Sequence, residues 1–163
     1  MGKYGRPIDD ANLSGRERAQ KALDEMGSIK EQAMRWVKYQ KELSGNGVST
    51  LCMIYNATGN DVNLVGRHDW AGLGFHGGFK HNPVDHYPKV IANGEIGVFL
   101  HVHEESKPTG SIGAVVYRGV NGTGDKYCDF MLAWYNSWNN TFNRAAYSEV
   151  REMDHYKDDG VWV

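Results

Sequence analysis

The stretch that decides the fold class is GSIGAVVYRGVNGTGDKYCDFMLAWYN, residues 110–136. Its two runs, 110–119 and 126–136, are rich in β-branched and aromatic residues with a period of two, which is typical of β-strands. The pair Asn121-Gly122 between them is a turn signal. The stretch therefore predicts two consecutive strands without an intervening helix.

The same pattern continues on both sides of this stretch. Similar runs are VSTLCMIYNA (48–57), DVNLVG (61–66), EIGVFLHVH (95–103) and a weaker one, AYSEVRE (146–152). Many short strands separated by turn signals predict an antiparallel β-sandwich over residues 48–163, with a closed barrel as the alternative. Residues 68–88 resemble neither a strand nor a helix, and they predict a long ordered loop.

The first 44 residues have a different character. Residues 1–13 are polar, contain Gly and Pro, and predict a flexible arm. Two capping boxes then predict two helices within 14–44, the first closed by Gly27 and the second by Gly45. The boxes are Ser14 with Glu17 and Ser28 with Glu31. We therefore expect a mainly β, α+β chain in which residues 14–163 form a single domain and two N-terminal helices flank the sandwich.

Composition excludes several classes of protein. The chain has 163 residues, of which 40% are apolar and 23% charged, and its net charge of −2 comes without any Lys/Arg cluster. We therefore expect one globular domain and no nucleic-acid partner. No run approaches the roughly 18 apolar residues of a membrane span, and no secretory signal is evident. With Cys52 and Cys128 as its only cysteines, both inside strand patterns, the chain predicts buried free thiols and a cytoplasmic or nucleocytoplasmic protein.

The segment LAWYNSWNNTF, residues 132–142, combines large rings with amides. The strand period cannot bury the rings that follow residue 136, so they either cap one end of the sandwich or border a shallow pocket there. Such a pocket suits a sugar ring or a quaternary ammonium group, and hence a neutral or zwitterionic ligand. The candidate ligand-binding residues are Trp134, Tyr135, Asn136, Ser137, Trp138, Asn139 and Phe142.

A second candidate site lies on the run EIGVFLHVH. His101 and His103 are two residues apart, so they lie on the same face of a strand, with Phe99. Such a pair can supply two ligands of a divalent metal such as zinc. The alternative is that both histidines line a polar outer face. No motif for a catalytic nucleophile is present, and apart from this metal no cofactor is expected.

Four ordered motifs resemble the plant 23 kDa jasmonate-induced protein family. They are GNGVSTLCMIYNATG (45–59), GEIGVFLHVH (94–103), TGSIGAVVYRG (109–119) and CDFMLAWYNSWNN (128–140), and the similarity runs from about Arg16 to the end of the chain. This resemblance implies a stress- or wound-responsive protein.

A more distant similarity is to actinoporins and fungal fruit-body lectins. TGSIGAVVYRG followed by FMLAWYNSWNNTF (130–142) resembles their strand pair and aromatic loop. The resemblance implies a β-sandwich flanked by helices and places Tyr135, Ser137, Trp138 and Phe142 in a headgroup-binding region. The front helices are highly charged with a thin apolar face, so we do not expect them to form a pore.

Three hypotheses for function follow. The first is a stress- or defence-associated, non-enzymatic protein that binds a carbohydrate or a phospholipid headgroup through its aromatic loop. The second is a small metal-dependent enzyme of plant specialised metabolism that uses His101 and His103. The third is a homo-oligomeric or partner-binding module whose interface contains Trp36 and the loop 68–88.

Overall fold

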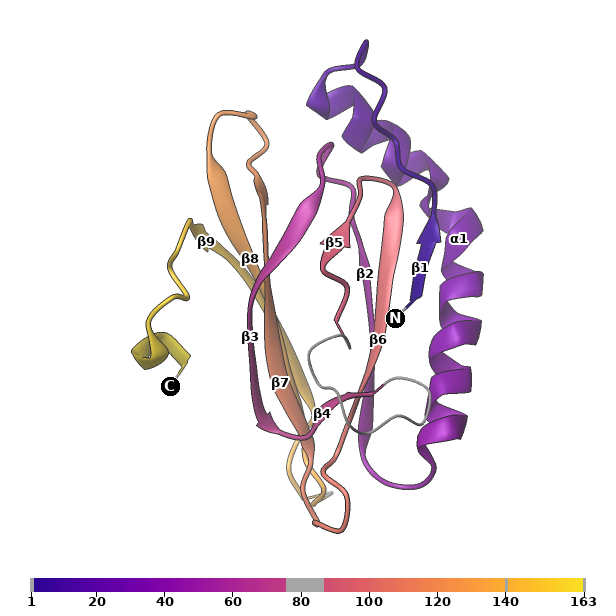
Figure 1. Cartoon of the computed structure of the whole chain (residues 1–163), viewed down its shortest axis with the longest axis vertical. Helices are drawn as coiled ribbons and strands as arrows, with labels where there is room; N and C mark the ends of the chain where they lie inside the picture. Colours follow the sequence, from indigo (N-terminus) through magenta and orange to yellow (C-terminus); the bar gives the residue numbers. More distant parts are fainter. Residues whose placement is uncertain (1, 76–86, 140, 163) are drawn as a thin grey trace.

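The computed structural model describes residues 2–75, 87–139 and 141–162 and consists of one long helix and two antiparallel sheets. Figure 1 shows three layers: α1 (Gly15–Ser44) lies along a four-stranded sheet, which packs on a five-stranded sheet. Strand β6 (Glu95–Val102) is central in the first sheet. It pairs with β2 (Ser49–Tyr55) on one side and with β1 (Gly2–Gly5) and β4 (Leu73–Phe75) on the other.

The five-stranded sheet has the order β5-β3-β7-β8-β9. Its strands are β5 (Val90–Ile91), β3 (Val62–Ala71), β7 (Ser111–Val120), β8 (Tyr127–Asn136) and β9 (Ala145–Glu152). The paired strands expected at residues 110–136 and the weaker strand after them are confirmed. The expected loop 68–88 is wrong at its start, because His68 to Ala71 extend β3 and Leu73–Phe75 form β4. Residues 76–86 of that loop lie outside the described residues.

The larger core lies between the two sheets. One face of β6 provides Phe99, which packs with side chains from β3, β7 and β8. The buried members of this cluster are Val62, Tyr87, Ile91, Phe99, Val115, Tyr117 and Trp134. The opposite face of β6 provides Ile96 and Val98. The predicted alternation of faces on this strand is confirmed, and it divides the side chains between two cores.

The second core lies between that opposite face of β6 and the helix. Ala33 and Val37 of α1 are fully buried against the sheet. Trp36 also packs against this cluster, so the indole that we considered for an oligomer interface contacts the protein's own interior. The hydroxyl of Tyr55 donates to the carbonyl of Ala22 and joins β2 to the helix.

The N-terminal predictions need two corrections. There is one helix, not two, because Gly27 lies within its interior and the hydroxyl of Ser28 bonds the Glu25 carbonyl instead of capping a new helix. An interior glycine costs a helix about 1 kcal/mol relative to alanine, which the buried face of α1 outweighs. Residues 1–13, expected as a flexible arm, include β1, and Ile8 is buried and hydrogen-bonded to Asn93. The first capping box, at Ser14 and Glu17, is confirmed.

Candidate functional site

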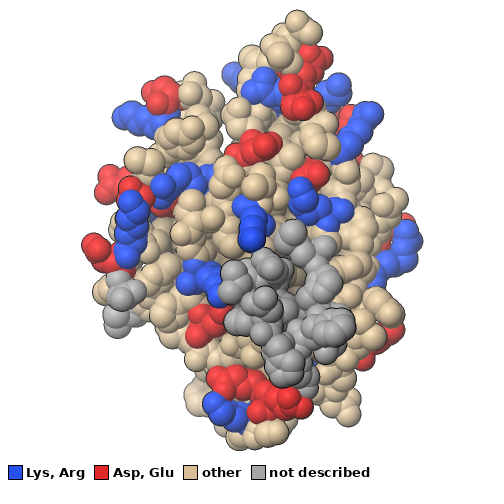
Figure 2. Space-filling view, viewed as in Figure 1, with Lys and Arg blue, Asp and Glu red and all other residues tan. Residues whose placement is uncertain are grey.

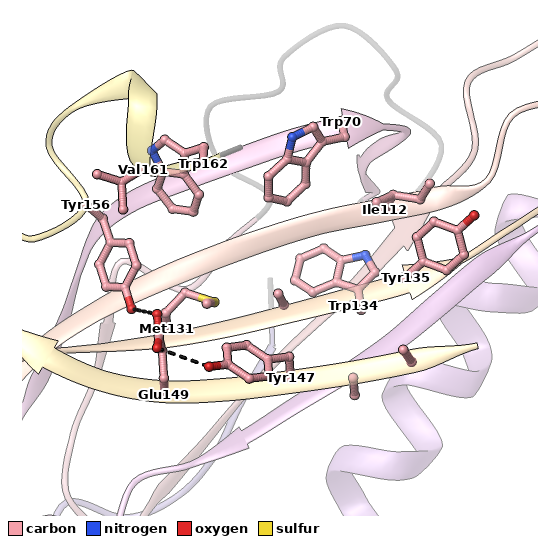
Figure 3. A pocket seen from close by; sticks show the side chains of 13 residues that line it. Trp70, Ile112, Met131, Trp134, Tyr135, Tyr147, Glu149, Tyr156, Val161 and Trp162 are labelled. Carbon is pink, nitrogen blue, oxygen red and sulfur yellow. Dashed lines mark hydrogen bonds between the residues drawn. The ribbon is translucent and has the colours of Figure 1, made fainter. Parts of the chain in front are cut away.

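An aromatic pocket of about 390 Å³ lies on the outer face of the five-stranded sheet, the face that points away from β6. We call it the outer-face pocket. Figure 3 shows its walls: Trp70, Trp162 and Tyr156 stand on one side, and Tyr147 and Glu149 on the other. The full lining is Trp70, Ile112, Met131, Ala133, Trp134, Tyr135, Ala145, Ala146, Tyr147, Glu149, Tyr156, Val161 and Trp162.

The strand register explains why the floor is apolar. Residues that face each other on antiparallel strands share a face, and here Ala133 pairs with Tyr147 and Tyr135 with Ala145. Alanines at two of these four positions leave space above the sheet, and the two tyrosine side chains border that space. The combination of small and aromatic side chains therefore forms the hollow.

Glu149 is the carboxylate of this pocket. Its Oε1 accepts a 2.6 Å hydrogen bond from the hydroxyl of Tyr156, and its Oε2 accepts one of 3.1 Å from Tyr147. Arg151 donates a further bond of 2.8 Å to Oε2. These bonds, that of Tyr156 first, hold the pKa of Glu149 below its usual range. The pocket thus combines ring faces with an ionised, well-held acid.

A network of charges holds the C-terminal segment over this face. Arg118 on β7 contacts Asp129 on β8 through two hydrogen bonds of 2.7 and 3.0 Å, and it also donates to Asp154 at 2.7 Å. The amide of Asp154 donates to Asp129, which is buried. Such paired geometry is the strong form of a charge-assisted hydrogen bond. The turn at Asp154 is therefore fixed to the sheet.

Beyond that turn, the 3-10 helix η2 (Asp159–Trp162) places Trp162 beside β3. The Trp162 ring stacks on His68 with centroids 5.5 Å apart and meets the edge of Trp70 at 6.1 Å. Tyr156 lies 5.5 Å from Trp162. Aromatic contacts of this kind add about 0.5–1.5 kcal/mol each beyond the area that they bury. The segment therefore forms one wall of the pocket.

The β8–β9 loop, described at residues 137–139 and 141–144, lies at one end of the sandwich (Figure 1). Trp138 is 48% exposed and Phe142 is 57% exposed. Trp138 contacts the His103 ring at 5.9 Å, while the amide group of Asn136 donates to the Ser49 carbonyl and anchors the start of the loop to β2. Ser137 and Asn139 accept hydrogen bonds from backbone amides within the loop. Of the seven predicted residues, Trp134 and Tyr135 line the outer-face pocket, and Tyr135 is the nearer of the two to this loop in the chain.

Trp134 differs from the other rings that we selected. It is only 7% exposed and packs against Phe99 and His101 in the core between the sheets. Its indole also covers Gly113, where an added Cβ would lie 2.7 Å from the ring. Trp134, which we predicted to stack on a ligand, is therefore mainly a core side chain. Only part of it lines the outer-face pocket.

The predicted histidine pair separates into two environments. His101 is fully buried between the sheets, so the alternative that both histidines line a polar outer face is wrong for it. Its Nδ1 lies 2.8 Å from the hydroxyl of Ser111, and its Nε2 lies 3.3 Å from Asp69 but out of line for a well-formed hydrogen bond. His103 is hydrogen-bonded to the Glu104 carbonyl. Among the described residues, no group of three or more His, Cys, Asp or Glu side chains is arranged to hold a metal ion.

Both cysteines are free, as predicted, although each is only partly buried. Within residues 2–75, 87–139 and 141–162, no helix is both long and apolar enough to cross a membrane.

Several residues of the outer-face pocket were missed from the sequence. Trp70 stood in the expected loop, and Tyr156 and Trp162 lie in a C-terminal segment without periodicity. Tyr147 and Glu149 alternate along AYSEVRE, for which we predicted only a weak strand, and this alternation is the signal that could have placed them on one strand face. What the alternation could not reveal was the segment that covers the face.

Comparison with known proteins identifies relatives of the whole chain. The sequence profile of the family described as Nakanori-like protein matches residues 1–163. The 23 kDa jasmonate-induced protein of Hordeum vulgare is 35% identical over 161 residues, which are 99% of this chain and 70% of the barley protein. The crystal structure of the lipid binding protein Nakanori superposes with a TM-score of 0.81 at 26% identity, covering 95% of this chain and 76% of that one.

These matches agree with the resemblance to the jasmonate-induced proteins, and they extend over the helix, both sheets and the aromatic pocket. The chain belongs to the Nakanori-like protein family.

Proposed function

We propose that this protein binds lipid headgroups at a membrane surface, through the aromatic end of its sandwich, in a stress or defence response. The observation that carries the proposal is the exposure of both Trp138 and Phe142 in one loop. Large rings are seldom left in water in pairs, and exposed indole and phenyl groups suit the interface between headgroups and acyl chains. A relative of the same fold is described as a lipid binding protein, and another as jasmonate-induced.

The outer-face pocket supplies the place for a headgroup. Tyr135 at its edge is the second residue before the loop begins, so a lipid held at the loop would have its headgroup near the pocket. Ring faces and the carboxylate of Glu149 together favour a quaternary ammonium group. We therefore propose a zwitterionic, choline-type headgroup as the ligand.

The charge distribution supports a zwitterionic lipid over an anionic one. Figure 2 shows Lys and Arg side chains intermingled with Asp and Glu on the face in view. The chain has a net charge of −2. Binding to acidic lipids normally depends on clustered Lys and Arg, each worth about 1 kcal/mol near the surface. Recognition here is therefore expected to depend on rings and shape.

Co-sedimentation with phosphatidylcholine vesicles tests the proposal. The variants Trp138→Ala and Phe142→Ala should each bind at least about tenfold more weakly, since each removes an anchoring ring. Tyr127→Ala is the matched control, because Tyr127 is 60% exposed at the opposite end of β8. It should bind as well as the wild type.

Two outcomes would refute the proposal. One is a wild-type protein that stays in the supernatant with these vesicles, and the other is undiminished binding by Trp138→Ala. A glycan array measured in parallel distinguishes the carbohydrate alternative: binding to a sugar without vesicle binding would replace the lipid by a glycan as the ligand.

A further inference from the structure

The inner face of β9 is left uncovered by the opposite sheet. Opposite residues of β8 and β9 share a face, and Leu132 and Trp134, which face the core, pair with Ser148 and Ala146. Both of these small β9 residues are nevertheless exposed. The four-stranded sheet ends at β2, so β9 extends past its edge. One side of the sandwich is therefore open.

Two adjoining hollows, of about 350 and 340 Å³, occupy this opening between β2 and the β8–β9 pair. Both are lined by Ile54, Leu132 and Ser148, so they are parts of one slot. At its inner end the slot reaches core side chains, which are Phe99, Val115 and Trp134 in one part and Tyr117 and Phe130 in the other. We call it the sandwich slot.

The walls of the sandwich slot are mainly apolar. The charged residue among them is Glu149, and its carboxylate is hydrogen-bonded to Tyr147, Tyr156 and Arg151. Cys52 lines it, and burial raises the pKa of this thiol to about 12, so the sulfur stays protonated at neutral pH. Ile54 and Leu132 supply aliphatic surface on the two sides. An ionic or strongly polar guest would lose its hydration here without a compensating partner.

The length of the slot suits one lipid chain. It follows β2 from Thr50 to Tyr55, which is roughly 17 Å at about 3.3 Å per residue. One leaflet of a bilayer has a hydrocarbon depth of roughly 15 Å, half of the whole core. At its Thr50 end the slot lies next to the hydrogen bond from Asn136 to Ser49, where the β8–β9 loop starts. One end of the slot therefore lies close to the loop that we propose to meet the membrane.

We infer that the sandwich slot accommodates a single hydrocarbon chain of a bound lipid. This inference rests on the proposed function for the source of the chain, and it adds a second, apolar site to the headgroup site. A second copy of the protein would be a less suitable occupant, because a partner strand pairing with β9 would meet the charged side chains of Glu149, Arg151 and Glu152 along that strand.

A fluorescent fatty acid, cis-parinaric acid, tests the slot without requiring a membrane. Titrated below its micellar concentration into the full chain, it should gain fluorescence as its polyene chain enters the slot. Ser148→Phe fills both parts of the slot and should weaken this binding at least tenfold. Ala146→Leu, which narrows one part, should have a smaller effect in the same direction.

Glu152→Phe is the matched control, because it adds the same ring at another exposed residue of β9 that lines neither part of the slot. It should bind the fatty acid like the wild type. Circular dichroism melts of all variants confirm that they are folded, which is expected at exposed positions.

The inference falls if the wild type does not bind the fatty acid, or if Ser148→Phe binds it unchanged. It also falls if light scattering finds a wild-type dimer that Ser148→Phe dissociates, since the slot would then be a subunit contact. Failure of the proposed function is separate: the wild type would then bind the fatty acid but no phosphatidylcholine vesicle.

Discussion

The hydroxyl of Tyr156 donates a 2.6 Å hydrogen bond to Glu149, which joins the C-terminal segment to the last strand of the five-stranded sheet. Tyr156 is buried and Glu149 lies on the wall of the outer-face pocket. The bond therefore helps to hold the segment on the sheet and lowers the pKa of Glu149.

Replacing Tyr156 with Phe should raise the pKa of Glu149 toward its ordinary value, because this hydrogen bond is the first cause of the lowering. A lowered pKa in the folded state means that Glu149 contributes stability above its unfolded value of about 4.3 and loses it as the pH falls through the folded pKa. Carboxyl carbon NMR titration measures the change. Tyr147→Phe, which removes a lesser bond, should give a smaller rise, and equal titrations in wild type and Tyr156→Phe would contradict this account.

Replacing Gly27 with Ala should raise the free energy of unfolding by about 0.5–1 kcal/mol. Gly27 is exposed in the interior of α1, and an added Cβ there meets nothing within 4 Å. Gly97→Ala is the contrasting variant: its Cβ would lie 2.5 Å from Ile91 in the core, and it should destabilise by roughly 1–3 kcal/mol. Urea denaturation measures both. If Gly27→Ala were less stable than the wild type, the protein would need the break in the helix at this glycine that the sequence predicted.

Much of the architecture could be predicted because it depends on local patterns. The strand periods of 95–103 and 126–136 reflect side chains that alternate between two environments, and they are confirmed. The single helix was missed because Gly27 reads as a stop, although its cost is small beside the burial of Ala33 and Val37. Strand β1 was missed because four residues that include two glycines have no pattern before they pair with β6.

The candidate site was only partly predictable for a different reason. Trp138 and Phe142 come after the end of a predicted strand. This position, which can be read from the sequence, indicates that both rings are exposed. The inward turn of Trp134 depends on the space above Gly113 of the neighbouring strand. The outer-face pocket depends on a C-terminal segment held by Arg118 and Asp154, which are 36 residues apart in the chain. Contacts of such long range leave no periodic signal.

Two tryptophans four residues apart should respond very differently to substitution. Trp134→Ala removes a buried ring and should cost about 3–5 kcal/mol of stability, as for large core side chains generally. Trp138→Ala removes a half-exposed ring and should change the stability by less than about 1 kcal/mol. Urea unfolding of the two variants under identical conditions compares them. Similar costs would mean that the two rings have similar burial.

Asp69 should make stability depend on pH in the acid range. Desolvation would raise its pKa, but the close contact with His101, the hydrogen bond from Tyr87 and the charge of Arg67 outweigh it and hold the pKa below the usual value. Its contribution is therefore complete above the unfolded pKa of about 3.9 and is lost as the pH falls through the lower, folded value.

Asp69→Asn should accordingly reduce stability at pH 7 and flatten the loss of stability below about pH 4. Urea unfolding measured at intervals from pH 7 to pH 2.5 gives both slopes. Asp154→Asn is a useful comparison, since its carboxylate has a lowered pKa for different reasons, the bonds from Lys157 and Arg118. If the stability of Asp69→Asn falls with decreasing pH as steeply as that of the wild type, the pH dependence of stability comes from other carboxylates.

Asp69 and the buried residues His101 and Ser111 together have the composition of a serine-hydrolase triad. Its hydroxyl lies 2.8 Å from an imidazole nitrogen, and a carboxylate oxygen lies 3.3 Å from the other nitrogen. Yet Ser111 and His101 are fully enclosed, and the same hydroxyl lies 2.8 Å from that of Thr50 across the two sheets. The roles of the two ring nitrogens are also exchanged, because in that triad the hydroxyl bonds Nε2 and the carboxylate bonds Nδ1. A resemblance of composition alone therefore gives no hydrolase site, and an acyl substrate could not reach the enclosed serine. Here the three residues connect the two sheets through polar contacts, because His101 lies on β6 and the other two lie on strands of the five-stranded sheet.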